Sequence, residues 1–289
     1  MFPPFFTGKS YWSRLGFLVL FVLSGMIIFG AVAVWLPIVL KLNENSRNYI
    51  YVVQTVSSLG LFLCPALLFS YCNSKKLFAY SWADKTTSVS LIGIVILLSL
   101  FILPIIAFLG YFNEQLALPE TLKNIEIWMK NMEEANKNLL KTLTDNSNLF
   151  ILILNIVVMA LFPALFEEFL FRGTLQPFFT NWFQNKHLAI LLTAFIFSFI
   201  HFQFYGFIPR FLLGIYLGYL LVWGKSLWLP IVAHFLHNAL SLFFDFVAQR
   251  KGIDLDTVNP SETVGFYPLV LVCVMCVATG IYLMWRKAR

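Results

Sequence analysis

The sequence predicts an all-α protein, a polytopic bundle of about eight transmembrane helices with one amphipathic helix outside the membrane. Hydrophobic residues make up 60% and aromatic residues 18% of the 289 residues, whereas charged residues make up 12%, against about 25% in an ordinary soluble domain. The mean hydropathy is +0.80. A chain of this composition has too little polar surface for a water-soluble globule. A soluble enzyme, a nucleic-acid-binding domain and a disordered chain are therefore excluded.

Eight apolar runs along the chain are candidate membrane spans. Roughly 20 apolar helical residues cross a hydrocarbon core, and helices are expected because lipid offers no hydrogen-bond partner to open strand edges. The first run follows Lys9 and Arg14 as in a signal peptide, but its apolar stretch is longer than a signal peptide needs, so we expect it to be the first span. The eight expected spans are Leu15–Leu40, Tyr49–Cys72, Val89–Phe112, Leu149–Glu167, Leu188–Ile200, Phe211–Gly224, Leu227–Phe244 and Val264–Trp285.

Positive charges are distributed unevenly between the two sides of the expected bundle. Eight spans place both termini on one side. With the termini inside, the inner segments hold eleven Lys and Arg residues. The short outer loops hold five, namely Lys41, Arg47, Arg210, Arg250 and Lys251. Because short cytoplasmic loops are enriched in these residues, we expect a multi-pass protein of the plasma (inner) membrane with cytoplasmic termini. The net charge of +6 then faces anionic lipid, and nucleic acid is not expected as a partner.

One long polar segment, Asn113–Asn148, separates the third and fourth spans. Its apolar residues recur every three or four positions, which is typical of an amphipathic helix. We expect this helix to lie on the membrane or to cap the bundle, with a gate over a substrate cavity as the sharper alternative. No internal repeat or linker is visible, so residues 1–289 are expected to form one membrane domain. The apolar stripe consists of Leu118, Leu122, Ile125, Met129 and Met132.

Ionisable side chains are absent from the first three spans and present in the second half of the chain. A charge at the centre of a spanning helix costs at least about 2.5–3.5 kcal/mol, so its presence indicates a function. We therefore expect a polar cavity between the spans from Leu149 onward, while Asp245, near the end of its run, is expected at the membrane interface. The candidate site residues are Glu167, Glu168, Arg172, His201, His234, His237 and Asn238.

The first cluster contains two adjacent carboxylates, Glu167 and Glu168, followed by Arg172. On a helix, Glu168 and Arg172 share one face and can form an ion pair. Glu167 is rotated by about 100° from Glu168, so it faces a different neighbour. Pro163, one turn earlier, is expected to kink the helix, as often happens beside a cavity. The simpler interpretation is a group of charges at the membrane surface.

Two further clusters complete a candidate hydrolytic site. His201 follows Phe197 by four residues, and His234 and Asn238 are four apart on one helical face. An imidazole and a carboxamide placed together can stabilise an oxyanion, and a carboxylate such as that of Glu167 can act as general base for a water molecule. No Ser or Cys lies in a pattern typical of a covalent nucleophile.

The same side chains leave a metal site open as an alternative. Glu167, His201 and His234 match the composition of a catalytic zinc ligand set, although the HExxH arrangement is absent. Spacing cannot separate the metal-bound site from the metal-free one, and no cofactor is favoured. His237, three residues after His234, is expected only to support the site. The Cys273–Cys276 pair lies in an apolar run and is expected to pack as small hydrophobic side chains.

The three clusters resemble, in order, the EExxxR, FxxxH and HxxxN motifs of the CAAX prenyl protease and bacteriocin-processing family of intramembrane proteases. The motifs lie at Glu167–Arg172, Phe197–His201 and His234–Asn238, within a family-like core of residues 148–247. The resemblance implies a helical bundle that hydrolyses a peptide bond in a membrane-associated substrate, which could be prenylated or bacteriocin-like.

The resemblance also implies a role for each site residue. Glu167 and His201 would position the attacking water, and His234 and Asn238 would hold the tetrahedral oxyanion. The Glu168–Arg172 pair would order the site. Although the family has been described as metalloproteases, its glutamate and histidine arrangement also supports a metal-free mechanism, which is the one we expect.

Two other functions stay open from the sequence. One is a catalytically idle membrane protein that binds a partner and regulates or protects it. The other is a proton-coupled transporter, which is disfavoured because transporters built from inverted repeats carry functional groups in both halves. Gly214 and Gly218 form a GxxxG pair, for which packing within the chain is favoured over a dimer interface. The oligomeric state, monomer or homodimer, is left open.

One geometric problem remains in the predicted spans. At 1.5 Å of helix per residue, Glu167 would lie near the inner face of the membrane and His201 much further across it. Different helix limits or a break at Pro163 would have to bring these two residues together.

Overall fold

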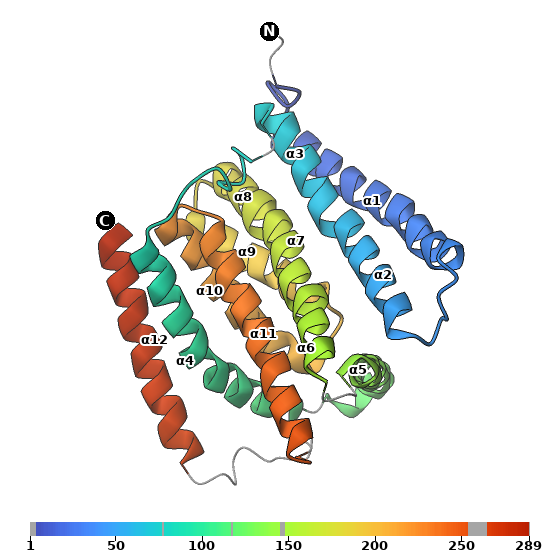
Figure 1. Ribbon diagram of the computed structural model, residues 1–289. Helices are drawn as coiled ribbons and strands as arrows, with labels where there is room; N and C mark the ends of the chain where they lie inside the picture. The colour runs from blue at the N-terminus through green and yellow to red at the C-terminus, as the bar shows by residue number, and fades with distance from the viewer. Residues whose placement is uncertain (1–3, 77, 117, 145–147, 254–264, 289) are drawn as a thin grey trace.

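The computed structural model describes residues 4–76, 78–116, 118–144, 148–253 and 265–288, so Val264, the expected start of the last span, lies outside the described residues. Within these ranges the chain is helical and contains no strand, which confirms the all-α class. Seven of the described helices are long and apolar enough to cross a membrane. The chain is therefore an integral membrane protein with a polytopic helix bundle (Figure 1).

The first two spans form a hairpin that lies to one side of the other helices (Figure 1). They approach each other closely at two glycines, where a Cβ atom on Gly25 would lie 2.0 Å from the carbonyl oxygen of Gly60. Only glycine fits at such a contact. The first span is α1 (Tyr11–Val39), and the second consists of α2 (Arg47–Ser58), the π-helix η1 (Leu59–Leu63) and α3 (Cys64–Ser74).

The fourth expected span is one helix of 35 residues, Leu149–Phe183, called the central helix below. Two π-helical stretches interrupt it, and each ends two residues before a proline, Pro163 or Pro177, because proline lacks the N–H that a regular α-helix needs. The predicted end of this span near Glu167 is wrong, because the helix continues to Phe183. Arg172, five residues after Glu167, is buried in the protein and does not lie at the membrane surface. Its segments are α6 (Leu149–Asn155), η3 (Ile156–Leu161), α7 (Phe162–Leu170), η4 (Phe171–Leu175) and α8 (Gln176–Phe183).

The chain reverses after α8 and returns through α9 (Lys186–Phe199), which packs against α8. The sequence predicts a span here, but α9 has 14 residues and a length of about 21 Å, too short to cross the hydrocarbon core. Seven helices, not eight, therefore reach spanning length. The chain turns again at residues 200–206, through η5 (Phe204–Gly206), into α10 (Phe207–Gly224). The remaining long helices are α4 (Val89–Glu114), α11 (Trp228–Arg250) and α12 (Phe266–Ala288).

The polar segment forms η2 (Glu120–Leu122) and α5 (Lys123–Thr144). α5 lies across one end of the bundle and is seen end-on in Figure 1. The rings of Trp128 and Phe204 pack with their centroids 5.7 Å apart, so α5 covers the turn at residues 200–206. In the structure α5 lies in one of the two placements expected for this segment, across one end of the bundle.

The apolar stripe of α5 is divided between two environments. Met129 and Met132 are half-buried, whereas Leu122 and Ile125 are 40% and 49% exposed. Leu118 lies before the helix and is half-buried. The exposed part of the stripe can therefore rest on the membrane surface, as an interfacial helix does.

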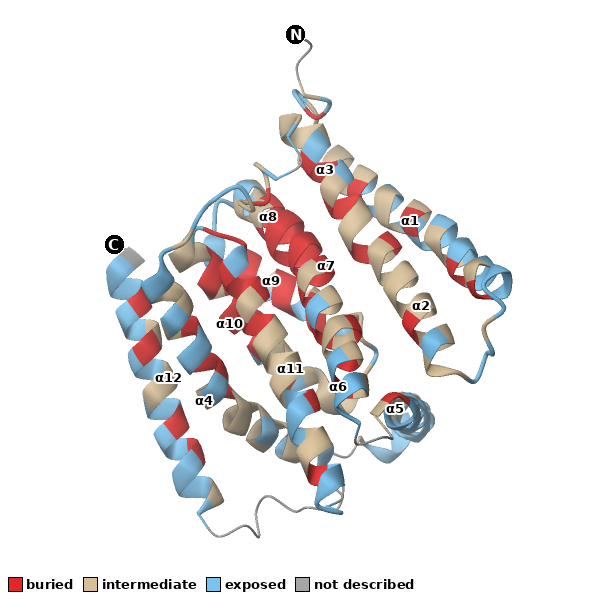
Figure 2. Cartoon of the chain, in the orientation of Figure 1, coloured by how far each residue is buried: buried red, intermediate tan, exposed pale blue. Residues whose placement is uncertain are grey.

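The first turn of α1 and the last turn of α12 lie at the same end of the bundle, and α5 lies at the other end (Figure 1). Buried residues are concentrated where α7 to α10 meet (Figure 2). The candidate site residues lie in this densely packed region and beside the turn that α5 covers.

Candidate active site

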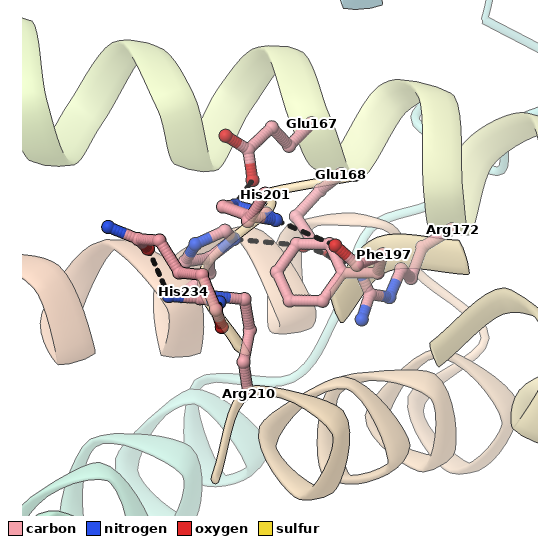
Figure 3. A network of polar contacts seen from close by, with 8 residues as sticks. Glu167, Glu168, Arg172, Phe197, His201, Arg210 and His234 are labelled. Atoms are coloured by element: carbon pink, nitrogen blue, oxygen red, sulfur yellow. Dashed lines mark hydrogen bonds and ion pairs between the residues drawn. The ribbon is translucent and has the colours of Figure 1, made fainter. Parts of the chain in front are cut away.

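Glu168 is the hub of a fully buried ionic cluster (Figure 3). Its Oε1 atom accepts hydrogen bonds from Arg172 Nη1 at 3.0 Å and from His234 Nδ1 at 2.9 Å. The side chains of Glu168 and Arg172 are 0% exposed. The predicted ion pair is thus present, and the alternative of a charge cluster at the membrane surface is wrong.

Arg172 contacts two further neighbours besides Glu168, while its Nε atom is buried without a hydrogen-bond partner among the described residues. Its Nη2 atom donates a hydrogen bond to the carbonyl oxygen of Gly214 at 3.1 Å, and its guanidinium lies 4.5 Å from the ring centroid of Phe197. A buried guanidinium requires such hydrogen bonds and an opposite charge. Arg172 therefore links the central helix to α10 and α9.

Glu167 faces a different neighbour, as its helical rotation predicts. Its Oε2 atom lies 3.9 Å from Nε2 of His201, and the side chains of Glu167 and His201 are 11% and 26% exposed. Nδ1 of His201 donates to the carbonyl oxygen of Phe197 at 2.7 Å, so Nε2 presents its lone pair towards Glu167. One water molecule can hydrogen-bond to both atoms across 3.9 Å, since each bond needs about 2.8 Å.

Phe197 explains the spacing of the second cluster. Its carbonyl oxygen orients the His201 ring four residues later. Its own ring lies edge-on to the ring of His234, with centroids 5.7 Å apart, and covers Arg172. This one residue therefore packs on the buried ionic cluster and also fixes the imidazole that faces Glu167.

An apolar cavity of about 600 Å³ opens beside Glu167 and His201. Its walls are aliphatic and aromatic side chains of α1, η1 and the segment from α7 to α9, including Leu18, Met26 and Phe179. Glu167 and His201 are its ionisable lining residues. A site of this shape buries an apolar chain and presents it to a small polar group. The contribution of α1 to the cavity wall could not be predicted, because none of the three sequence motifs lies in α1.

The third cluster lies on α11. His234 is buried and uses Nδ1 to donate to Glu168. Asn238 is half-buried, and its side chain makes no hydrogen bond among the described residues. His237 is half-buried, and its Nδ1 atom is enclosed without a hydrogen-bond partner in the described part of the chain. Asp245 lies two turns beyond Asn238, outside this cluster.

Glu167, His201 and His234 are the side chains that the sequence offers as possible zinc ligands. No group of three or more His, Cys, Asp or Glu side chains among the described residues has a spacing that could hold a metal ion. His201 Nε2 lies 3.9 Å from Glu167 Oε2, and His234 Nδ1 donates to Glu168. The mechanism proposed below contains no metal step.

Two polar residues near the site were not predicted. Arg210, which the sequence places in an outer loop, lies in the first turn of α10 and extends towards the polar group from the side opposite Glu167 (Figure 3). Its Nη2 atom donates to Gln203 Oε1. The sequence feature that could have indicated a role for Arg210 is its position directly after Pro209, at the start of an apolar run.

The glycine pair on α10 packs within the chain, as favoured from the sequence. A Cβ atom on Gly214 would lie 3.0 Å from the Cβ of Ala194, and one on Gly218 would lie 2.8 Å from Ile190 Cγ2. The carbonyl oxygen of Gly218 also accepts a hydrogen bond from Gln176 Nε2 at 2.9 Å. Two contacts four residues apart, at Gly214 and Gly218, thus align the central helix with α10.

Residues 149–240 match the family model described as type II CAAX prenyl endopeptidase Rce1-like. The matched segment runs from the start of α6 into α11 and contains all three clusters. The resemblance to the CAAX prenyl protease family is thereby confirmed over this segment. No curated protein and no solved structure matches the chain significantly.

Proposed function

Because residues 149–240 match the Rce1-like family, we propose that the chain is an intramembrane endopeptidase that hydrolyses a peptide bond in a membrane-associated substrate. The observation that supports this most strongly is the Glu167–His201 pair at the end of an apolar cavity of about 600 Å³. The cavity would receive an apolar or prenylated part of the substrate. Prenylated peptides and bacteriocin-like peptides are the two substrate classes to compare.

The proposed reaction uses a water molecule between Glu167 Oε2 and His201 Nε2. Glu167 takes a proton from this water, and the water oxygen bonds to the peptide carbonyl carbon. The resulting tetrahedral oxyanion accepts hydrogen bonds from His234 and Asn238. The proton then passes from Glu167 to the peptide nitrogen, the C–N bond breaks, and an amine and a carboxylic acid leave.

The hydrogen bond between His234 and Glu168 limits how His234 can act. Because Nδ1 of His234 donates to Glu168 Oε1, its Nε2 can donate to an oxyanion only when the ring carries both protons. The same hydrogen bond fixes the orientation of the His234 ring. Glu168 and Arg172 are therefore proposed to order the site without contacting the substrate.

The test is cleavage of a peptide set, with and without farnesyl groups, by the purified protein in detergent, read by mass spectrometry. Glu167→Gln is expected to lower kcat by about 10²- to 10⁴-fold, the usual contribution of a general base. The matched control is Glu134→Gln, which removes an exposed carboxylate on α5. Equal cleavage by wild type and Glu167→Gln would reject the proposed site, and a cellular function that survives Glu167→Gln would favour the idle, partner-binding protein.

A metal chelator provides a second arm of the same experiment. Because the water is proposed to be held by Glu167 and His201 alone, cleavage is expected to keep its rate after dialysis against EDTA. Loss of cleavage in EDTA that returns with added zinc would show that a metal holds the water, and the glutamate mechanism would then be wrong.

We also propose that the end of the bundle formed by both termini faces the cytoplasm of the plasma (inner) membrane. The support is the distribution of Lys and Arg in the short loops and at the termini. Without Arg172, which is buried, and Arg210, which lies in the first turn of α10, it is ten against four. α5 would then lie on the opposite side. Single cysteines introduced at Glu134 on α5 and at Lys186, the first residue of α9, both exposed, would be labelled in intact cells by a membrane-impermeant maleimide. Labelling at residue 134 alone is expected, and labelling at 186 alone would reverse the orientation.

A further inference from the structure

α5 carries an apolar stripe along one flank, called the outer stripe below. Successive residues of an α-helix are rotated by about 100°, so positions three or four apart share a flank. Ile125, Trp128 and Leu139 on this flank are 49%, 46% and 45% exposed. The outer stripe shares two residues with the stripe predicted from the sequence. It consists of Ile125, Trp128, Met132, Ala135 and Leu139.

The opposite flank of α5 is charged. Lys130, Lys137 and Lys141 are rotated by about half a turn from the outer stripe. Lys130 forms an ion pair with Glu126 at 2.6 Å. Ile127, which is 50% exposed, is an apolar residue close to these charges. An apolar flank and a lysine-bearing flank on opposite sides are typical of a helix that lies in the membrane interface.

α5 lies at the level where spanning helices end. It follows α4, which ends at Glu114, and it precedes the central helix, which begins at Leu149. Its axis lies across the end of the bundle (Figure 1). At this end the spanning helices present large apolar side chains, Phe112 on α4 and Phe150 on α6, which are 45% and 65% exposed. The lipid that surrounds these side chains therefore reaches the depth of α5.

The C-terminal turn of α5 is tied to two helices of the bundle. Nε of Arg47, on α2, donates to the carbonyl oxygen of Thr142 at 3.0 Å. Nδ2 of Asn155, on α6, donates to the carbonyl oxygen of Leu143 at 3.1 Å. A helix held in this way at one end keeps its rotation about its own axis, so the outer stripe keeps its direction.

Trp128 belongs both to the outer stripe and to the cover of the turn at residues 200–206. Its ring packs on that of Phe204 with centroids 5.7 Å apart, while 46% of the residue is exposed. Phe204 follows His201 by three residues. Tryptophan is enriched at membrane interfaces because its ring is amphipathic. Lipid that holds the outer stripe would therefore also hold Trp128 on this turn.

We propose that the outer stripe of α5 lies in the lipid leaflet and that this contact holds α5 over the turn that follows His201. The bilayer is then part of the cover of the candidate active site. Lipid fits the stripe better than a second copy of the chain does, because a row of five side chains is narrow beside the roughly 800 Å² that each partner buries in a stable protein interface. This inference does not depend on the proposed peptidase function.

The first test locates the outer stripe relative to lipid. Nitroxide labels are attached to Ile125→Cys and Ile127→Cys in the full-length protein, with its four native cysteines replaced by alanine, in vesicles of phosphatidylcholine and phosphatidylglycerol. Electron paramagnetic resonance measures collisions with oxygen, which concentrates in lipid, and with a water-soluble nickel complex. The positions are matched, because both are isoleucines, 49% and 50% exposed, on different flanks of one helix. The oxygen-to-nickel ratio is expected to be several-fold higher at residue 125.

Two results of this test would overturn the lipid contact. One is an oxygen-to-nickel ratio at residue 125 that is equal to or lower than the ratio at residue 127. The other is protection of residue 125 from both reagents together with spin–spin broadening, which would show that a second copy of the chain covers the stripe.

The second test measures whether the lipid contact holds the cover, by hydrogen exchange and mass spectrometry in the same vesicles. Ile125→Asp places a charge in the leaflet, and the turn at residues 200–206 is expected to exchange about 10-fold faster, because a cover that leaves the leaflet protects the turn less. Ile125→Asn, which is polar but uncharged, is expected to have a smaller effect. The matched control, Ile127→Asp, is expected to exchange as wild type does.

The exchange of α10 in the same sample is the reference, so that general loosening of the protein is separated from loss of the cover. The ratio of exchange in the turn to exchange in α10 is expected to rise in Ile125→Asp alone. An unchanged ratio in Ile125→Asp, or an equal rise in Ile127→Asp, would overturn the link between the lipid contact and the cover.

Discussion

Glu167 and His201 lie at the same distance along the chain, 17 residues, from Gln184, where the chain reverses (184 − 167 and 201 − 184). Gln184 ends α8 with a left-handed backbone (φ 52°), and α9 returns beside α8. At about 1.5 Å per residue, the two residues are each about 25 Å from this turn along the helices. They therefore lie at the same depth in the bundle, where their side chains approach to 3.9 Å.

This depth places the site between an apolar cavity and the turn that α5 covers. Because α9 is short and α10 starts again at Phe207, the turn at residues 200–206 lies partway along the bundle instead of at its surface. The turn is covered by α5, through the contact of Trp128 with Phe204, and not by a spanning helix. The cavity beside α1 provides the apolar side of the same site.

The first prediction concerns the close contact at Gly218. In Gly218→Ala, the new Cβ atom would lie 2.8 Å from Ile190 Cγ2 and 3.0 Å from Gln176 Oε1. Overpacking of this kind is expected to lower the free energy of unfolding by about 1–3 kcal/mol, measured by denaturant unfolding in detergent. The control is Gly93→Ala on α4, where nothing lies within 4 Å of the new atom and stability is expected to stay the same or rise. An equal effect in both variants would contradict the packing role.

The second prediction concerns the buried ion pair of Glu168 and Arg172. Arg172→Met leaves the Glu168 carboxylate without its cation, and removing one partner of a buried pair costs about 3–5 kcal/mol of stability. The double variant Glu168→Gln/Arg172→Met removes both charges and is expected to be more stable than Arg172→Met alone. Unfolding of wild type, both single variants and the double variant gives the coupling energy. Additive effects would show that the two side chains do not depend on each other.

The ionic cluster is also where the sequence was most informative. The four-residue spacing of Glu168 and Arg172 and the rotation of Glu167 away from them are local properties of a helix, so both could be predicted. The partners outside the helix could not. Arg172 donates to the carbonyl oxygen of Gly214, which is 42 residues away in the sequence. From the sequence alone this contact is not visible, and a charged residue after an apolar run then indicates the end of a span. The predicted span therefore stopped at Glu167, and the expected separation from His201 was too large.

Arg210 was misplaced for a related reason. An arginine next to Pro209 at the edge of an apolar run has the pattern of a loop residue. The apolar run Leu188–Ile200 is shorter than the roughly 20 residues that a span needs, which was the one sign that α9 would not cross the membrane. The direction of the chain at residues 200–206 depends on tertiary contacts, chiefly those of Asn113 and Trp128. Such contacts join segments about 90 residues apart and have no periodic signal.

The third prediction concerns Asn113, at the end of α4, as a positioning residue. It is buried, its Nδ2 donates to the carbonyl oxygens of Phe204 and Tyr205, and its Oδ1 accepts from the backbone N–H of Ile208. Asn113→Ala releases the turn that carries His201. Because small displacements of catalytic groups lower the reaction rate strongly, we expect kcat to fall by about 10- to 100-fold with a smaller change in KM.

The controls for Asn113 separate positioning from general damage. Asn113→Asp keeps the acceptor for Ile208 and loses the two donated bonds, so its kcat is expected to lie between those of wild type and Asn113→Ala. Asn131→Ala, at an exposed position on α5, is expected to leave kcat unchanged. A loss in Asn113→Ala that is confined to the yield of folded protein, with kcat preserved, would show a structural role only.

The last prediction is a pH dependence that comes from Glu133 on α5. Burial raises the pKa of the Glu133 carboxyl group, the positive charges of Lys137 and Arg210 lower it, and the negative charge of Glu114 raises it, with a net increase above the ordinary value. The folded protein therefore holds the Glu133 proton at pH values where the unfolded chain has released it, and stability contributed by this group falls as pH rises from the unfolded pKa, about 4.3, through the raised folded pKa. Glu133→Gln, which stays neutral, is expected to melt at a higher temperature than wild type at pH 7 and at a similar temperature at pH 4. Glu134→Gln, at the exposed neighbouring position, provides the control, and a Glu133→Gln difference that does not shrink on acidification would contradict the assignment.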